Sequence, residues 1–126
     1  MDYEMKEIST KYPSMEVLKD MYKTIMLYLR GSGGFTERMR QFWTWGAYSF
    51  KYICSNDGCY GIQFMVSGML HKGRVRVYYN PSSDYFDVEL LRPRKDSLVW
   101  GCSDLDFTQL HNVLHQHIER TDDEEV

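Results

Sequence analysis

Four segments in the middle of the chain alternate apolar and polar residues with a period of two: 48–54, 60–67, 74–80 and 85–91. Such alternation predicts the strands of an antiparallel sheet with one buried face and one exposed face. Amphipathic helical patterns on both sides complete a two-layer α+β domain, in which the helices pack on the apolar face. We predict that residues 1–121 form this single domain and that the acidic end, 122–126, is a flexible tail.

The apolar spacing also predicts how the first two strands pair. The loop 56–58, Asn-Asp-Gly, fits a three-residue hairpin turn. It would pair apolar residues throughout, from Cys54 with Tyr60 to Tyr48 with Val66. A slip of one residue would exchange the two faces of the strand, so the pattern selects this register.

The next connections extend the sheet as a meander. The loop 68–73 is predicted to place Val66 opposite Val75. The loop 81–84 closes a third hairpin, whose expected pairs are Tyr79 with Phe86, Val77 with Val88, Arg76 with Glu89 and Tyr78 with Asp87. Opposite charges across strands stabilise by up to about 1 kcal/mol. A shorter fifth strand is predicted at 97–101, which makes a sheet of four or five strands.

The two flanking helices carry their own start signals. The first is predicted over 14–30, with Ser14 as N-cap and a glycine-rich stop after it. The last begins at Asp106, with Gln109 three residues on as its capping-box partner.

Between the first helix and the sheet, Thr36 is predicted to cap a short helical turn over 37–41, and the sheet is expected to begin near Trp43 or Trp45. In a strand, the two tryptophans would lie on one side. They would either cover the first helix or form a partner site, because tryptophan is enriched at interaction hot spots.

Two residue pairs have spacings that suggest metal ligands. The predicted register places Cys54 on the core face and Cys59 on the opposite face, so the two thiols would not share one ion. His111 and His115 are spaced i, i+4, but the residues between them lack the glutamate of the metalloprotease motif. We expect these histidines to be exposed or at a boundary, and we expect no metal and no cofactor.

The face of the sheet away from the helices is the first candidate for a binding surface. Its predicted members are Ser49, Lys51, Gln63, Met65, Arg74, Arg76, Tyr78, Asp87 and Glu89. Basic and aromatic side chains on an open sheet can bind single-stranded nucleic acid. The loop 92–95 adds the positive charges of Arg92, Arg94 and Lys95. In the competing interpretation, Arg76 pairs with Glu89 across the strands and is not available to a ligand.

Charge and composition give a partial prediction of the charge of the partner and of the cellular compartment. The formal net charge is −3, and four consecutive acids at 122–125 account for it, so an anionic partner of the body stays open. The absence of a signal segment and the three cysteines predict a cytoplasmic protein that does not span a membrane. An exposed edge strand leaves pairing with a second copy open.

One stretch resembles a known group of proteins. The run from Gly68 to Asn80, with its Arg-Val-Arg-Val-Tyr-Tyr-Asn strand, and the return strand Asp-Tyr-Phe-Asp-Val at 84–88 are similar to small uncharacterised proteins of gut bacteria and their mobile elements. The resemblance implies a bacterial origin and no activity.

No local motif carries catalytic chemistry. The leading hypothesis is therefore a non-enzymatic binding or adaptor protein that acts through the open sheet face or the Trp43/Trp45 region, with another protein as partner. The alternatives are a nucleic-acid-binding module that uses the sheet face and the basic loop, and an enzyme whose site assembles only in three dimensions.

Overall fold

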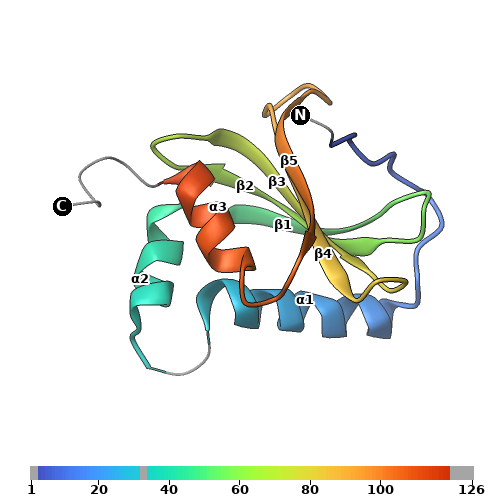
Figure 1. Ribbon diagram of the computed structural model, residues 1–126, viewed down its shortest axis with the longest axis horizontal. Helices are drawn as coiled ribbons and strands as arrows, with labels where there is room; N and C mark the ends of the chain where they lie inside the picture. The colour runs from blue at the N-terminus through green and yellow to red at the C-terminus, as the bar shows by residue number, and fades with distance from the viewer. Residues whose placement is uncertain (1–2, 32–33, 120–126) are drawn as a thin grey trace.

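The computed structural model describes residues 3–31 and 34–119 (Figure 1). In chain order the elements are α1 (Met15–Arg30), α2 (Glu37–Thr44), β1 (Tyr48–Cys54), β2 (Tyr60–Ser67), β3 (Lys72–Asn80), β4 (Tyr85–Leu91), β5 (Leu98–Leu105) and α3 (Leu110–Ile118). The strands form one antiparallel sheet in the order β1-β2-β3-β4-β5. The predicted α+β class is confirmed. The acidic tail, 122–126, lies outside the described residues.

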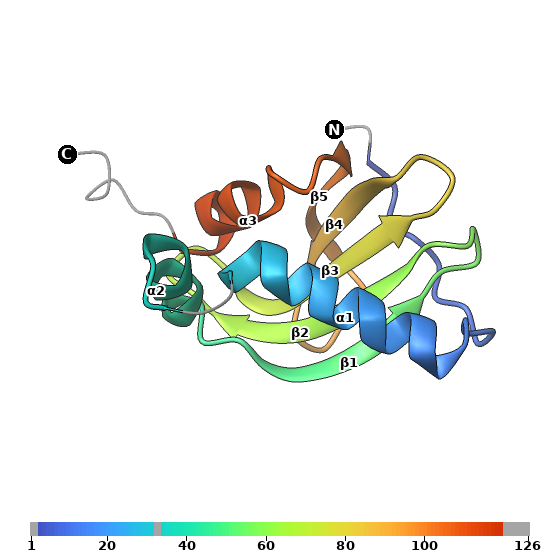
Figure 2. The same cartoon turned by 90° about the horizontal axis from the view of Figure 1, so that it is seen from below.

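The core lies between the sheet and the three helices. Apolar side chains from β2, β3 and β4 pack against α1, α2 and α3 in one continuous cluster, which includes Ile62, Val75, Val88, Ile25, Leu114 and Ile118. Figure 2 shows α1 running across the sheet, with α2 and α3 at its C-terminal end. Among the described residues, no helix has the length and apolar character that a membrane crossing requires.

The first helix forms as its sequence predicts. The Ser14 hydroxyl accepts a hydrogen bond from the Val17 amide at 3.3 Å, which satisfies one of the free donors of the first turn. At the other end, Gly31 adopts a φ of 80° and donates its amide to the Leu27 carbonyl at 2.8 Å. Glycine adopts this positive φ without a Cβ clash, and it ends the helix here.

The short predicted turn after Thr36 is a full helix, α2, and the sheet begins later than predicted, at Tyr48. This difference separates the two tryptophans. Two residues apart on a strand share a face, whereas two residues apart on a helix point to nearly opposite sides. Trp45 is fully buried, while 60% of the Trp43 side chain is exposed.

The first hairpin follows the predicted register only near its turn. Cys54 lies opposite Tyr60, as predicted. Farther along, β1 contains a bulge, in which Ser49 has a φ of 56°. The extra residue makes Tyr48 face Met65, so the predicted pairing of Tyr48 with Val66 is wrong.

The second connection is tighter than predicted. Val66 lies opposite Gly73, and Val75 lies opposite Phe64, so the predicted pair of Val66 with Val75 is wrong by two residues. A Cβ on Gly73 would lie 2.4 Å from the Leu91 carbonyl oxygen, so only glycine fits there. Because the shift is two residues, each side chain keeps its predicted face.

The third hairpin has the predicted register, including Arg76 opposite Glu89 and Tyr78 opposite Asp87. The fifth strand is longer than predicted. At the last helix, the Gln109 side chain accepts the Asp106 amide at 2.8 Å, which is half of the predicted capping box. The regular helix nevertheless begins later, at Leu110.

The second face of the sheet is covered. Tyr3 and Lys6 lie against it, where both bind Glu89, and Ile8 forms a bridge with Ser55 beyond the end of β1. The ring of Tyr3 packs on Gly101 of β5, where a Cβ would lie 2.3 Å from the ring. In Figure 2 this N-terminal segment passes behind the strands, on the side away from α1. The prediction that this face is exposed is therefore wrong for most of its members.

Candidate functional site

The covered face holds a buried network of charged side chains, centred on Glu89. This residue is fully buried, and its Oε2 accepts hydrogen bonds from the Tyr3 hydroxyl at 2.6 Å and the Lys6 amide at 2.7 Å. Its Oε1 lies 3.7 Å from Nη1 of Arg76. Burial, and then the hydrogen bond to Glu89, raise the pKa of Tyr3 above the ordinary range. A buried carboxylate needs such partners, so the N-terminal segment is part of the fold.

Lys6 extends the network to the first hairpin. Its Nζ lies 2.8 Å from Oδ2 of Asp57 and 3.0 Å from Oδ2 of Asp87. Burial lowers the pKa of Lys6, but the hydrogen bonds to the two carboxylates outweigh burial and hold that pKa above its usual value. Burial opposes ionisation of Asp57 too, yet the bonds from Lys6 and Ser55 lower its pKa to about 2. Both groups are therefore charged near neutral pH.

The two arginines predicted to bind a ligand are engaged within the protein. Arg76 is 4% exposed, and its Nε donates to the Gln63 side chain at 2.9 Å. Arg74 donates to the carbonyl oxygens of Arg92 at 3.0 Å and Lys95 at 2.5 Å. Both guanidinium groups also approach Asp96, Arg74 at 3.0 Å and Arg76 at 3.6 Å. These bonds hold the loop between β4 and β5 and leave few free N–H donors on the two arginines for a phosphate.

The other predicted site residues are scattered. Tyr78 is fully buried, and Met65 is half-buried. The side chains of Arg92, Arg94 and Lys95 are exposed on the loop at the top of Figure 1. Lys51 is exposed at the β1 edge, where with Tyr22, Phe50 and Tyr52 it lines a hollow of about 270 Å³. The structure does not bring these residues into one site.

Trp45 and two histidines join the three helices. The Trp45 Nε1–H donates to His115 Nδ1 at 2.9 Å, and the indole stacks on His111 with ring centroids 5.4 Å apart. His111 also lies 2.6 Å from the Leu29 carbonyl oxygen and 2.8 Å from Gln41 Oε1. Burial lowers the pKa of His111. The prediction that these histidines are exposed or at a boundary is wrong, because they fill the junction of α1, α2 and α3.

The cysteines lie as the first hairpin predicts. Cys54 is buried beside the carbonyl oxygens of Ser9 and Lys11, whereas Cys59 packs with Ile53 and Tyr78 on the covered face. Over residues 3–31 and 34–119, no group of three or more histidine, cysteine or acidic side chains is arranged to hold a metal ion.

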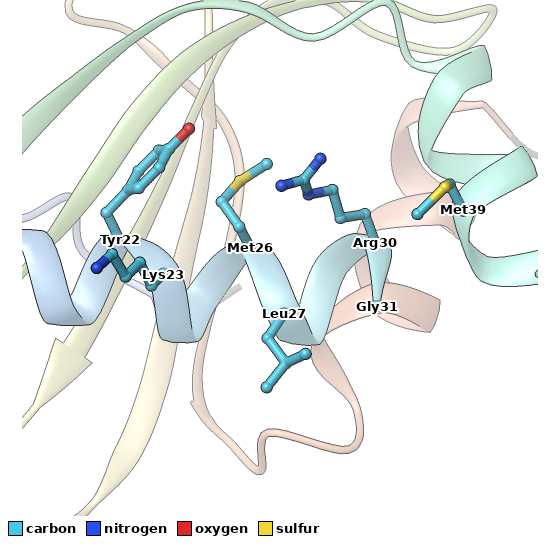
Figure 3. Close-up of a pocket in the computed structure, with 7 residues that line it drawn as sticks. All are labelled: Tyr22, Lys23, Met26, Leu27, Arg30, Gly31 and Met39. Carbon is cyan, nitrogen blue, oxygen red and sulfur yellow. The ribbon is translucent and has the colours of Figure 1, made fainter. Parts of the chain in front are cut away.

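The helices carry the strongest candidate surface, which lies between the C-terminal half of α1 and α2. One hollow of about 330 Å³ is lined by Tyr22, Lys23, Met26, Leu27, Arg30, Gly31 and Met39. Figure 3 shows that six of these residues come from α1 and its C-terminal end, and that Met39 of α2 lies near Arg30. A second hollow of about 360 Å³ shares Leu27 and Gly31 with the first and is completed by Tyr28, Arg38, Phe107 and Thr108.

Two exposed aromatic side chains lie on α2 and just before it, although neither of them lines a hollow. Phe35 is 65% exposed and Trp43 is 60% exposed, and their rings contact each other at 5.3 Å. Met39 and Trp43 are four residues apart and therefore share one side of α2. We call the two hollows, together with Phe35 and Trp43, the α1–α2 face. It combines apolar walls, exposed aromatic rings and basic side chains.

Sequence reasoning identified Trp43 but missed the rest of this face. A signal for it is present in α1, where Lys23, Leu27 and Arg30 recur at spacings of four and three residues on the side away from the core stripe. By contrast, residues 3–12 show no strand or helix periodicity that would have predicted their place on the sheet.

Comparisons of the chain with protein-family models, with curated proteins and with solved structures found no match. The proposals below are therefore argued from the geometry.

Proposed function

We propose that the protein is a non-enzymatic binding protein that engages another protein through the α1–α2 face. The observation that carries the proposal is the pair of exposed aromatic rings, Phe35 and Trp43, on and just before α2, the helix that also lines two adjoining hollows. Exposed aromatic groups of this size mark interaction surfaces, and tryptophan is among the residues that contribute most to binding energy. The unpaired cysteines support a reducing compartment such as the cytoplasm.

The walls of the hollows support a protein partner. Leu27 is 44% exposed, and the thioethers of Met26 and Met39 lie on either side of the first hollow. Methionine side chains adapt to differently shaped apolar partners, and they are frequent at protein-binding surfaces. Among the described residues, the ionisable side chains that line the two hollows are basic or tyrosine, so neither hollow offers a carboxylate or a histidine to the enzyme alternative.

Nucleic-acid binding is the second candidate, because Arg92, Arg94 and Lys95 are exposed together. It has weaker support, since Arg74 and Arg76 are bonded to this loop and to Asp96 and since the aromatic Tyr78 is buried. Stacking of bases needs an accessible ring near the cations.

The proposal is tested by affinity capture from lysate of the native host, with quantitative mass spectrometry. We expect at least one protein to be recovered by the wild-type chain and lost with Phe35→Ala/Trp43→Ala. The matched control is Tyr85→Ala, which removes a ring of similar exposure at the far hairpin; it should retain that protein. Equal recovery by all three chains, or recovery that nuclease treatment abolishes, would contradict the proposal.

A further inference from the structure

We infer that the partner segment that binds the α1–α2 face is acidic and carries a large apolar side chain. This inference rests on the proposed function and names the chemistry of the partner. It is drawn from the charges around the hollows, which are basic.

Basic side chains surround both hollows. Lys23 and Arg30 line the first, and Arg38 lines the second. Among the described residues, no aspartate or glutamate lines either hollow. The chain nevertheless has a formal net charge of −3. Because four acids at 122–125 account for this charge, the rest of the chain does not oppose an acidic partner. The face is a local basic region, and such a region attracts acidic partners and repels basic ones.

One acid close to this region is paired within α2. Glu37, in the first turn of α2, pairs with Arg40, whose Nε and Nη2 donate to its two carboxylate oxygens at 2.6 and 2.9 Å. Arg38 is turned to the second hollow, where Phe107 and Leu27 form the apolar wall. A carboxylate of the partner would face Arg38 or Arg30, and an apolar side chain beside it would enter the hollow between Leu27 and Met39.

A basic groove can also attract nucleic acid, but the walls favour polypeptide. The first hollow has the methionines and Leu27 among its walls, and the exposed ring of Trp43 lies one helical turn from Met39 on α2. Nucleic acid would need a phosphate track in line with stacked bases. An acidic amphipathic segment matches both parts of the face, since its charges meet the arginines and its apolar side chains enter the hollows.

The test is selection of a displayed random-peptide library against the full chain, followed by affinity measurement of the selected peptides. We expect the peptides that require Phe35 and Trp43 to be enriched in aspartate and glutamate, with a leucine, phenylalanine or tryptophan among them. Their affinity should fall as NaCl is raised from about 50 to about 500 mM, because salt screens exposed charges.

Two variants with the same change in net charge locate the effect. Lys23→Glu/Arg30→Glu should weaken the acidic peptides by about tenfold or more, because two attractive contacts become repulsive. Arg92→Glu/Arg94→Glu, on the loop at the opposite end of the molecule in Figure 1, should change their affinity by less than about threefold. Circular dichroism checks that both variants fold.

The outcomes separate the inference from the proposed function. Peptides that need Phe35 and Trp43 but show no acidic enrichment would overturn the inference and leave the protein-binding proposal standing. Absence of any peptide that needs these rings would count against both. Tighter binding of oligo-dT than of every selected peptide would assign the face to nucleic acid. Binding that appears only after removal of residues 120–126 would assign it to the chain's own acidic end.

Discussion

Replacing Glu89 with leucine is expected to lower the free energy of unfolding by about 3–5 kcal/mol, the usual cost of removing one partner from a buried charge network. The Tyr3 hydroxyl and the Lys6 amide would lose their acceptor, and Arg76 would lose the carboxylate opposite it on β4. Urea unfolding followed by circular dichroism measures the effect.

Glu89→Gln is the matched control, because it keeps a carbonyl oxygen for Tyr3 and the Lys6 amide and removes only the charge. We expect it to cost clearly less than Glu89→Leu. Equal stability of the leucine variant and the wild type would contradict the network, and it would mean that residues 3–12 are not held on the sheet as the structure shows.

Replacing Trp45 with alanine is the second large effect. The indole is fully buried and bridges α1, α2 and α3 through His111 and His115. Loss of a buried side chain of this size costs about 3–5 kcal/mol, because it leaves a cavity as well as removing apolar contact. Thermal or urea unfolding of the variant measures the loss.

Trp43→Ala is the control for Trp45→Ala, since it makes the same chemical change two residues earlier at an exposed position. We expect it to change the free energy of unfolding by less than about 0.5 kcal/mol. Its effect should instead be on binding. A large loss of stability in Trp43→Ala, or none in Trp45→Ala, would show that the assignment of the two rings is reversed.

The sequence predicted the sheet well, because its period-two pattern constrains the face on which each side chain lies more strongly than the residue that lies opposite it. The pairing of Val66 is off by two residues, yet every side chain of β3 keeps its predicted face. Arg76 is opposite Glu89 as predicted. The bulge at Ser49 was not predictable, since nothing in the residue types there requires one.

The candidate site was harder to predict, because tertiary contacts decide it. Whether Arg76 and Tyr78 bind a partner or lie in the interior depends on Tyr3 and Lys6, 70 or more residues away in the chain. The N-terminal segment is polar and without periodicity, so only the structure reveals that it supplies the partners of Glu89. The tryptophans were misassigned because a helix, and not a strand, carries Trp43.

The central claim is that the N-terminal segment around Tyr3 and Lys6 closes one face of the sheet and that the α1–α2 face is open. Hydroxyl-radical footprinting of the free, full-length chain tests it most directly. The account predicts fast oxidation of Phe35 and Trp43 and strong protection of Tyr78 and Trp45, with Tyr85 as an exposed tyrosine for comparison. Oxidation of Tyr78 as fast as that of Tyr85, with Trp43 protected, would contradict it.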